Sequence, residues 1–277
     1  MKKILSVIIV VIVILAGGWF VFVRGTTPRT EEKISSAMVG LIKASGGHFQ
    51  LYVNTKSDPT ATTAPSEINI IADGDFQKNS NGSLGLNSKI TATGATTGVS
   101  VTGNGEARLV NGKLYYKFNE IPPIFTNLEA VRGKWLSGAT NLQFLSEPSR
   151  TALVSVLQQP QLFVEIKQVG KEKVGNFKTT HFQAKFSPSG YASILEAMMQ
   201  VFGSNVPVNK TALENSFKSH DNAPLDIWID SANKLRKLAI SYVNSQNKAK
   251  VNIEVLFTPL VGTPKIEEPV IETPTTK

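Results

Sequence analysis

The N-terminal stretch Ile4–Val23 contains one polar residue, Ser6. Twenty residues at about 1.5 Å per residue span roughly 30 Å, which is the hydrocarbon thickness of a bilayer. The pattern predicts a membrane-spanning helix over residues 4–23, preceded by a cytoplasmic leader of residues 1–3. A cleaved signal peptide is the alternative. Its apolar core is about 7 to 15 residues long and ends at an A-x-A-like site, which Ala16–Trp19 matches poorly.

A helical period follows a linker over residues 24–30. Glu31 and Glu32 favour the positive end of a helix dipole. Apolar residues then recur at i, i+4, i+7 and i+8, and these are Ile34, Met38, Leu41 and Ile42. The pair Gly46–Gly47 ends the pattern, so the sequence predicts one amphipathic helix just outside the membrane.

From Phe49 the period changes to two, which is typical of half-buried β-strands. The alternation predicts strands over residues 49–53, 84–92, 99–109 and 114–118. Asn81–Gly82 and Asn111–Gly112 are strong signals for two-residue hairpin turns. Later strands are predicted over residues 162–169, 177–186, 225–230, 235–243 and 251–257.

Two further helices interrupt the strands. One runs from Pro148 to about Leu157, and the second has Ser187 as its cap and Pro188 at its first position. This order of strands, helices and strands predicts an α+β domain over residues 31–258, with a curved antiparallel sheet, or half-open β-barrel, covered by helices. Prolines recur every five residues beyond it, which favours an extended, disordered tail over residues 259–277.

The composition excludes several classes of function. The 277 residues carry 29 basic and 21 acidic side chains, a net charge of +8, and no cysteine. Lipid attachment at a cysteine, thiol catalysis and cysteine-based metal sites are therefore excluded. Positive charges flank the predicted span almost equally and do not orient it. The short leader favours an extracytoplasmic C-terminal domain of a single-pass cell-membrane protein.

Motifs for catalysis are sparse. Ser231–Lys234 fits S-x-x-K, but its position between two strands predicts a hairpin turn. The three histidines, His48, His181 and His220, have no second ligand at metal-like spacing. Asp73 and Asp75 flank Gly74, a spacing that could hold a cation but is more typical of a solvated strand. We therefore expect no enzyme activity, no catalytic residue, no metal and no cofactor.

Lysine-rich stretches such as Lys171–Lys173 lack the interleaved aromatic residues of a nucleic-acid platform. Nucleic acid is therefore not expected as a partner. The exported part keeps a mildly basic balance, which is compatible with a place near an anionic membrane.

Several segments resemble the LppX/LprG type of envelope lipoprotein in the LolA-like (outer-membrane lipoprotein carrier-like) superfamily. They are Gly105–Tyr115, Gly133–Trp135, Val169–Phe182 and Pro224–Asp230. The resemblance implies a half-open barrel whose concave face, lidded by helices, holds acyl chains during transport across the envelope. The chain departs from the pattern at Gly18, where the lipidated cysteine would stand.

The sequence thus predicts a membrane-anchored envelope protein that binds or transports a lipid, or a lipidated or hydrophobic ligand, in a cavity between sheet and helices. The candidates for the cavity wall are Trp135, Met198, Met199 and Phe202. The alternative is a non-catalytic structural or sensory module that acts through an envelope protein partner.

Overall fold

The computed structural model describes residues 30–57, 66–79, 83–96, 99–122, 129–141, 147–159, 162–201, 211, 223–243, 248–262, 264 and 266–271. The predicted span over residues 4–23 lies outside these ranges. Within them, no helix has the length and apolar character needed to cross a membrane.

Three helices are described: α2 (Thr30–Ile42), α3 (Glu147–Leu157) and α4 (Pro188–Val201). Glu31 and Glu32 lie in the first turn of α2, as the dipole argument predicts. Ser187 caps α4, because its Oγ accepts a hydrogen bond of 2.9 Å from the Gly190 amide. All three helices begin within a few residues of their predicted positions.

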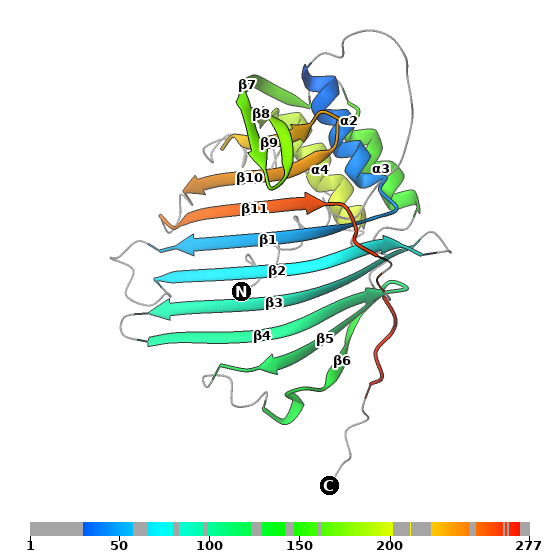
Figure 1. Ribbon diagram of the computed structural model, residues 1–277, viewed down its shortest axis with the longest axis vertical. Coiled ribbons are helices and arrows are strands. Elements are labelled where there is room, and N and C mark those ends of the chain that lie inside the picture. Colours follow the sequence, from blue (N-terminus) through cyan, green and yellow to red (C-terminus); the bar gives the residue numbers. More distant parts are fainter. Residues whose placement is uncertain are drawn as a thin grey trace.

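Eleven strands form one sheet (Figure 1). They are β1 (Gly46–Lys56), β2 (Glu67–Lys78), β3 (Leu84–Thr96), β4 (Val99–Val110), β5 (Lys113–Glu120), β6 (Trp135–Asn141), β7 (Phe163–Val174), β8 (Phe177–Phe186), β9 (Leu225–Asp230), β10 (Leu235–Val243) and β11 (Lys250–Thr258). The predicted strands are all present, and β2 and β6 are additional to them.

The strand order is β6-β5-β4-β3-β2-β1-β11-β10-β9-β8-β7, and the neighbours pair antiparallel. The last strand, β11, inserts beside the first, β1, and so joins a meander from the first half of the chain to one from the second. β6 and β7 pair on one side only among the described residues, so the sheet is open. The fold is therefore α+β with a curved, unclosed antiparallel sheet.

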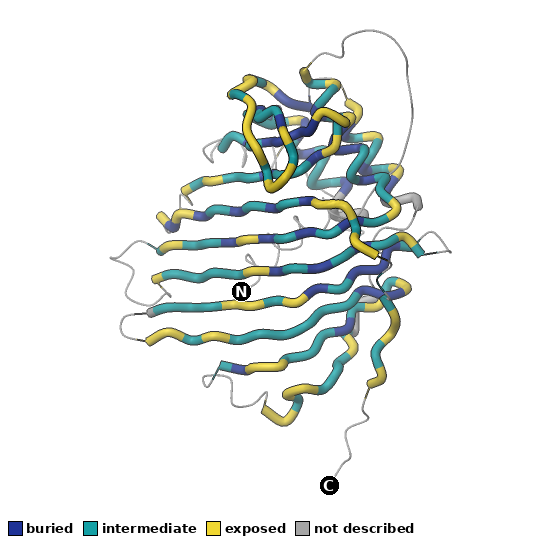
Figure 2. Tube along the Cα trace, in the orientation of Figure 1, coloured by how far each residue is buried: buried dark blue, intermediate teal, exposed yellow. Residues whose placement is uncertain are grey.

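The helices lie over one half of one face, called here the inner face. α2 packs on β7, β9 and β10, and α3 packs on α4 and α2. Side chains of α2 such as Ile34 and Ile42 share a core with Phe49, Leu51 and Ile227 of the sheet. Figure 2 shows buried positions concentrated on this half, whereas β3 and β4 are mostly intermediate or exposed away from one end.

The segment after β11 crosses the ends of the strands on the opposite, outer face (Figure 1). Tyr115 Oη donates a 2.9 Å hydrogen bond to Glu268 Oε2, and Arg108 donates one of 3.4 Å to the Glu267 carbonyl. A Cβ at Gly85 would lie 3.1 Å from the Ile266 side chain. Part of the tail predicted over residues 259–277 therefore makes specific contacts with the sheet.

Candidate functional site

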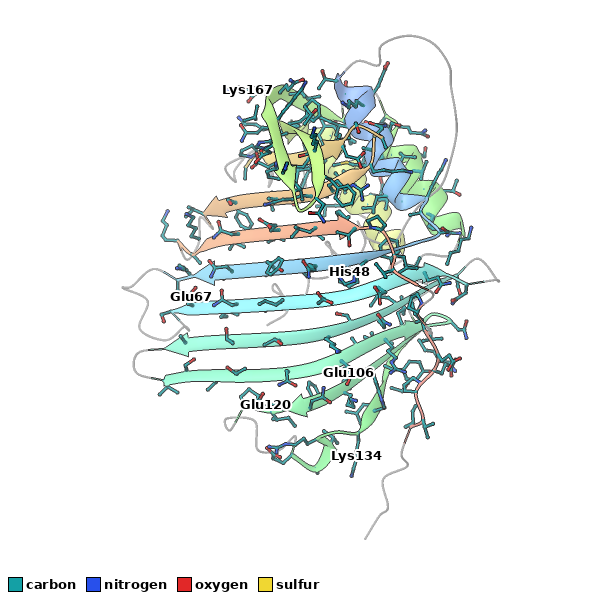
Figure 3. All side chains as sticks on the ribbon, in the orientation of Figure 1. His48, Glu67, Glu106, Glu120, Lys134 and Lys167 are labelled. Atoms are coloured by element: carbon teal, nitrogen blue, oxygen red, sulfur yellow. The ribbon has the colours of Figure 1, made fainter. Side chains whose placement is uncertain are left out.

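The two faces of the sheet differ in chemistry because side chains alternate along each strand. On β2, Ala72 and Phe76 face the core, whereas Asp73 and Asp75 face outward, where they meet Gln50 and His48. The registers carry this alternation through neighbouring strands. The result is an apolar inner face and an outer face of hydrogen bonds and ion pairs, part of which is visible around His48 and Glu106 in Figure 3.

The apolar inner face continues beyond the described helices. In one cross-strand row, Ile70 on β2 pairs with Ala92 on β3, which pairs with Gly103 on β4. In the next row, Ala72 pairs with Ile90, which pairs with Gly105. We call the partly exposed apolar positions of this region the open inner face. They are Ile68, Ile70, Ile90, Ala92, Val99, Val101 and Phe118. Val99 is 57% exposed, so apolar surface reaches solvent here.

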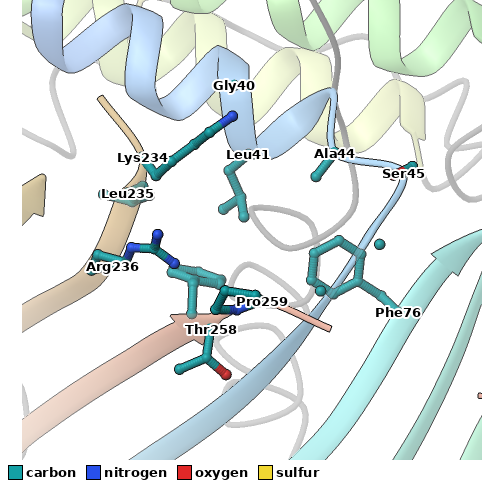
Figure 4. A pocket seen from close by; sticks show the side chains of 13 residues that line it. Gly40, Leu41, Ala44, Ser45, Phe76, Lys234, Leu235, Arg236, Thr258 and Pro259 are labelled. Atoms are coloured by element: carbon teal, nitrogen blue, oxygen red, sulfur yellow. The ribbon is translucent and has the colours of Figure 1, made fainter. Parts of the chain in front are cut away.

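A cavity of about 280 Å³ lies at the end of the helical layer. Leu41 and Ala44 border it from α2, while Phe76 and Phe257 belong to the inner face of β2 and β11. Figure 4 shows Lys234 and Arg236 approaching from the β10 side. The described lining residues are Gly40, Leu41, Ala44, Ser45, Gly46, Gly47, Phe76, Lys234, Leu235, Arg236, Phe257, Thr258 and Pro259.

Two glycines shape this space. A Cβ at Gly47 would lie 2.7 Å from the Phe76 ring, so only glycine lets that ring lie against β1. On α2, a Cβ at Gly40 would meet nothing within 4 Å. The cavity thus has an aromatic wall on the sheet side and open space on the helix side.

The two cations at the cavity have different partners. Arg236 is bound to the buried carboxylate of Asp230, with Nη2 at 2.6 Å and Nε at 2.7 Å from Oδ2. Lys234 is exposed and has no ion pair among the described residues. None of the lining residues that the structure describes is acidic. The cavity therefore combines apolar walls with one uncompensated positive charge, an environment suited to an anionic amphiphile.

Asp230 also builds the turn that presents Lys234. Its Oδ1 accepts hydrogen bonds from the amides of Ala232 at 2.8 Å and Lys234 at 2.9 Å. Asn233 has a positive φ of 57°, which suits the turn. The prediction that Ser231–Lys234 is a hairpin turn is confirmed by its position between β9 and β10.

Of the four predicted wall residues, the structure describes the side chain of Trp135. It lies on the outer face, with the Arg108 guanidinium 4.6 Å and Lys117 Nζ 5.1 Å from its ring centroid. Met198 and Met199 belong to α4, but their side chains and the whole of Phe202 lie outside the described residues. Trp135 is not among the residues that line the cavity. The role of Met198, Met199 and Phe202 as cavity walls stays a prediction.

The sequence did not point to Phe76, Phe257 or Lys234 as site residues. The alternation of β11 gives Phe257 its inward face, and Leu41 belongs to the predicted apolar stripe of α2. No local signal brings them together, because their proximity depends on the pairing of β11 with β1 across some two hundred residues of sequence.

The outer face of β8 and β9 holds a separate polar cluster. The His181 ring stacks on Trp228 at 4.2 Å, and its two nitrogens lie 2.8 Å from Asp226 and 3.0 Å from Glu172. Lys237 covers the other side of this group and pairs with Glu254 at 2.6 Å. Each polar group has a partner inside the cluster. These residues therefore bind one another and form a structural network.

Similarity to known proteins is limited to solved structures. The lipoprotein LppX of Mycobacterium tuberculosis is 12% identical, with a TM-score of 0.42 over 86% of this chain and 97% of that chain. LprF of Mycobacterium bovis is 14% identical, with a TM-score of 0.36 over 79% of this chain and 89% of that chain. No protein-family model matches the sequence, and no curated protein matches it significantly.

Proposed function

We propose that this protein binds an amphiphilic lipid on the inner face of its sheet without altering it chemically. The observation that carries the proposal is that one face of the sheet supplies both Phe76 and Phe257 to the cavity and, farther along, apolar residues that stay partly exposed. The apolar tail would lie along the sheet, and an anionic head would lie near Lys234.

The size of the cavity supports this arrangement. Small-molecule pockets measure about 300–1,000 Å³, and the cavity of about 280 Å³ holds only part of a lipid. The remainder of a chain would rest on partly exposed residues such as Ile70 and Ile90. Burial of each methylene contributes about 0.8 kcal/mol, so a long chain supplies the affinity and the polar head supplies orientation.

The proposal places the domain outside the cytoplasm, held to the membrane by the apolar segment 4–23. An anchored domain of this kind could pass a lipid between the bilayer and a partner in the envelope. The mildly basic surface and the absence of any lipid-attachment cysteine support anchoring by the helix itself.

Native mass spectrometry of the detergent-extracted full chain tests the proposal. We expect a co-purifying lipid mass that is lost in Gly40→Phe, because an aromatic side chain on α2 would fill the cavity. The matched control is Gly40→Ala, which adds one methyl group to open space and should stabilise α2 by about 0.5–1 kcal/mol. A ligand-free mass for the unmodified chain across several preparations would contradict the proposal.

A further inference from the structure

The β7–β8 hairpin stands out from the sheet (Figure 1) and is basic. Residues 163–186 contain five lysines and two glutamates. Lys185 pairs with Glu165 at 2.6 Å, and Glu172 is held by His181. The other four lysines, Lys167, Lys171, Lys173 and Lys178, are exposed and have no ion pair among the described residues. The hairpin therefore carries an uncompensated positive charge.

Two of these lysines face each other directly. Lys173 and Lys178 are cross-strand partners beside the turn at Gly175. Directly opposed like charges destabilise a sheet, since their Cβ atoms lie only about 5 Å apart. The other described pair of opposed lysines, Lys56 and Lys250, has Glu67 at 3.6 Å from Lys56. The pair at the hairpin tip has no such acid within the described chain.

Protection of a free sheet edge explains only part of this charge. Lysines and bulges on β7 prevent pairing with other chains, and β7 has two register shifts. Lys178 belongs to β8, which is paired on both sides by β7 and β9. Val164 and Val169 are also exposed, at 37% and 50%. Exposed valines beside lysines are unsuited to simple edge protection but suit a membrane interface.

The base of the hairpin lies beside the point where the chain enters the domain. The Phe163 amide is 3.4 Å from Glu31 Oε1 in the first turn of α2. Residues 24–29 separate α2 from the predicted span, and at no more than about 3.6 Å per residue they reach roughly 25 Å. With residues 4–23 in the bilayer, as the proposed function has it, the start of α2 stays within that distance of the membrane surface. Strands the length of β7 and β8 reach on the order of 30 Å, so the tip can meet that surface.

We propose that the hairpin, through Lys171, Lys173 and Lys178, docks on the anionic lipid headgroups of the bilayer that holds residues 4–23. Phosphate groups supply the counter-charge that the Lys173–Lys178 pair lacks. This surface is distinct from the cavity at the other end of α2, and docking there orients the domain on the membrane.

Lipid nanodiscs containing the full chain test the proposal. Because the chain has no cysteine, Asn176→Cys allows a single fluorescent label at the hairpin turn. Nitroxide-labelled lipid should quench this label in discs of phosphatidylcholine and phosphatidylglycerol in equal parts, and far less in discs of phosphatidylcholine alone. A label at Ala130→Cys, near Lys134 at the opposite end of the molecule from Lys167 (Figure 3), should stay unquenched in both.

The charge requirement has a matched control. Each lysine near an anionic surface changes the docking equilibrium by about fivefold. The variant Lys171→Gln/Lys173→Gln/Lys178→Gln should therefore lower the ratio of docked to undocked protein about a hundredfold, whereas Lys56→Gln/Lys248→Gln/Lys250→Gln should leave it unchanged. Equal quenching in the two kinds of disc, or equal effects of the two variants, overturns the proposal. A full chain that does not enter nanodiscs overturns it too, while leaving lipid binding in the cavity testable by mass spectrometry.

Discussion

At the scale of single residues, the hydrogen bond between Tyr115 and Glu268 is one of the contacts that hold the C-terminal segment on the sheet. Tyr115 lies on the outer face but is only 2% exposed, because residues of this segment cover it. Removal from water and the bond to the Glu268 carboxylate raise the pKa of Tyr115 above 10.0. Hydrogen bonds from Tyr115 and Asn111 lower the pKa of Glu268 below 4.5.

These pKa shifts predict a pH window for the contact. A lowered carboxyl pKa contributes stability above the unfolded pKa and loses it as the pH falls through the folded pKa. A raised tyrosine pKa contributes stability below about pH 10 and loses it as the pH rises further. The protection of residues 266–271 from hydrogen exchange, after correction for the intrinsic pH dependence of exchange, should therefore be highest between about pH 5 and 9 and lower on either side.

Tyr115→Phe removes the hydroxyl and should speed exchange in residues 266–271 within this window. Tyr116→Phe is the matched control, because the neighbouring ring lies on the inner face and packs at 5.6 Å from Phe118. The same exchange rates in both variants would show that the segment is held by other contacts.

At the scale of elements, the turn between β9 and β10 depends on one buried carboxylate. Asp230 holds two turn amides and the Arg236 side chain, and both charged groups are largely buried, at 7% and 11% exposed. Removing one partner of a buried pair leaves the other charge without compensation. This turn also places Lys234 at the cavity, so its geometry supports the proposed site.

Asp230→Ala should lower the free energy of unfolding by about 3–5 kcal/mol, as measured by urea denaturation. Asp73→Ala is the comparison, since the Asp73 side chain is 48% exposed and contacts Gln50 and His48 at the surface. Its cost should stay within about 1 kcal/mol. Similar losses for both variants would contradict the assigned role of Asp230.

The elements also show how much the sequence could predict. The strict alternation of β1, β3 and β5 and the capping residues of α4 are local signals, and these elements were predicted correctly. The extent of β2 was not predicted, although Asp73 and Asp75 were interpreted as part of a solvated strand, because the consecutive apolar residues Ile70–Ala72 interrupt the alternation. In the structure Gly74 is required by long-range packing, since a Cβ there would lie 2.0 Å from the Asn87 carbonyl on β3. β6 is short and irregular in register, so its alternation is too brief to recognise.

At the scale of the whole molecule, the three described helices cover only part of the eleven-stranded sheet. The local pattern predicts which side of each strand is apolar, but not how far the helices extend over it. The position of the cavity depends on where α2 ends relative to β2 and β11, and that relation is set by pairings between distant segments. The sequence could therefore predict the apolar side of each strand more readily than the residues that line the cavity.

A chain that begins at Thr26 tests whether residues 4–23 provide the membrane attachment. We expect this truncated chain to stay in the supernatant after ultracentrifugation without detergent and to keep the circular dichroism of a β-rich fold. The apolar span is then gone, and the described core lies entirely after residue 29. A truncated chain that aggregates, or that sediments with membranes at high salt, where the attraction of the hairpin lysines to lipid headgroups is screened, would contradict the assignment of the anchor.

Photo-crosslinking with a fatty acid that carries a diazirine along its chain tests the central claim most directly. The account predicts adducts on inner-face residues such as Ile70, Ile90 and Val101. Tyr52 and Ile71 serve as internal controls, because they are 37% and 44% exposed on the outer face and are equally open to non-specific labelling. Adducts confined to the inner face would support lipid binding between sheet and helices. Adducts on Tyr52 and Ile71 alone, or none at all, would contradict it.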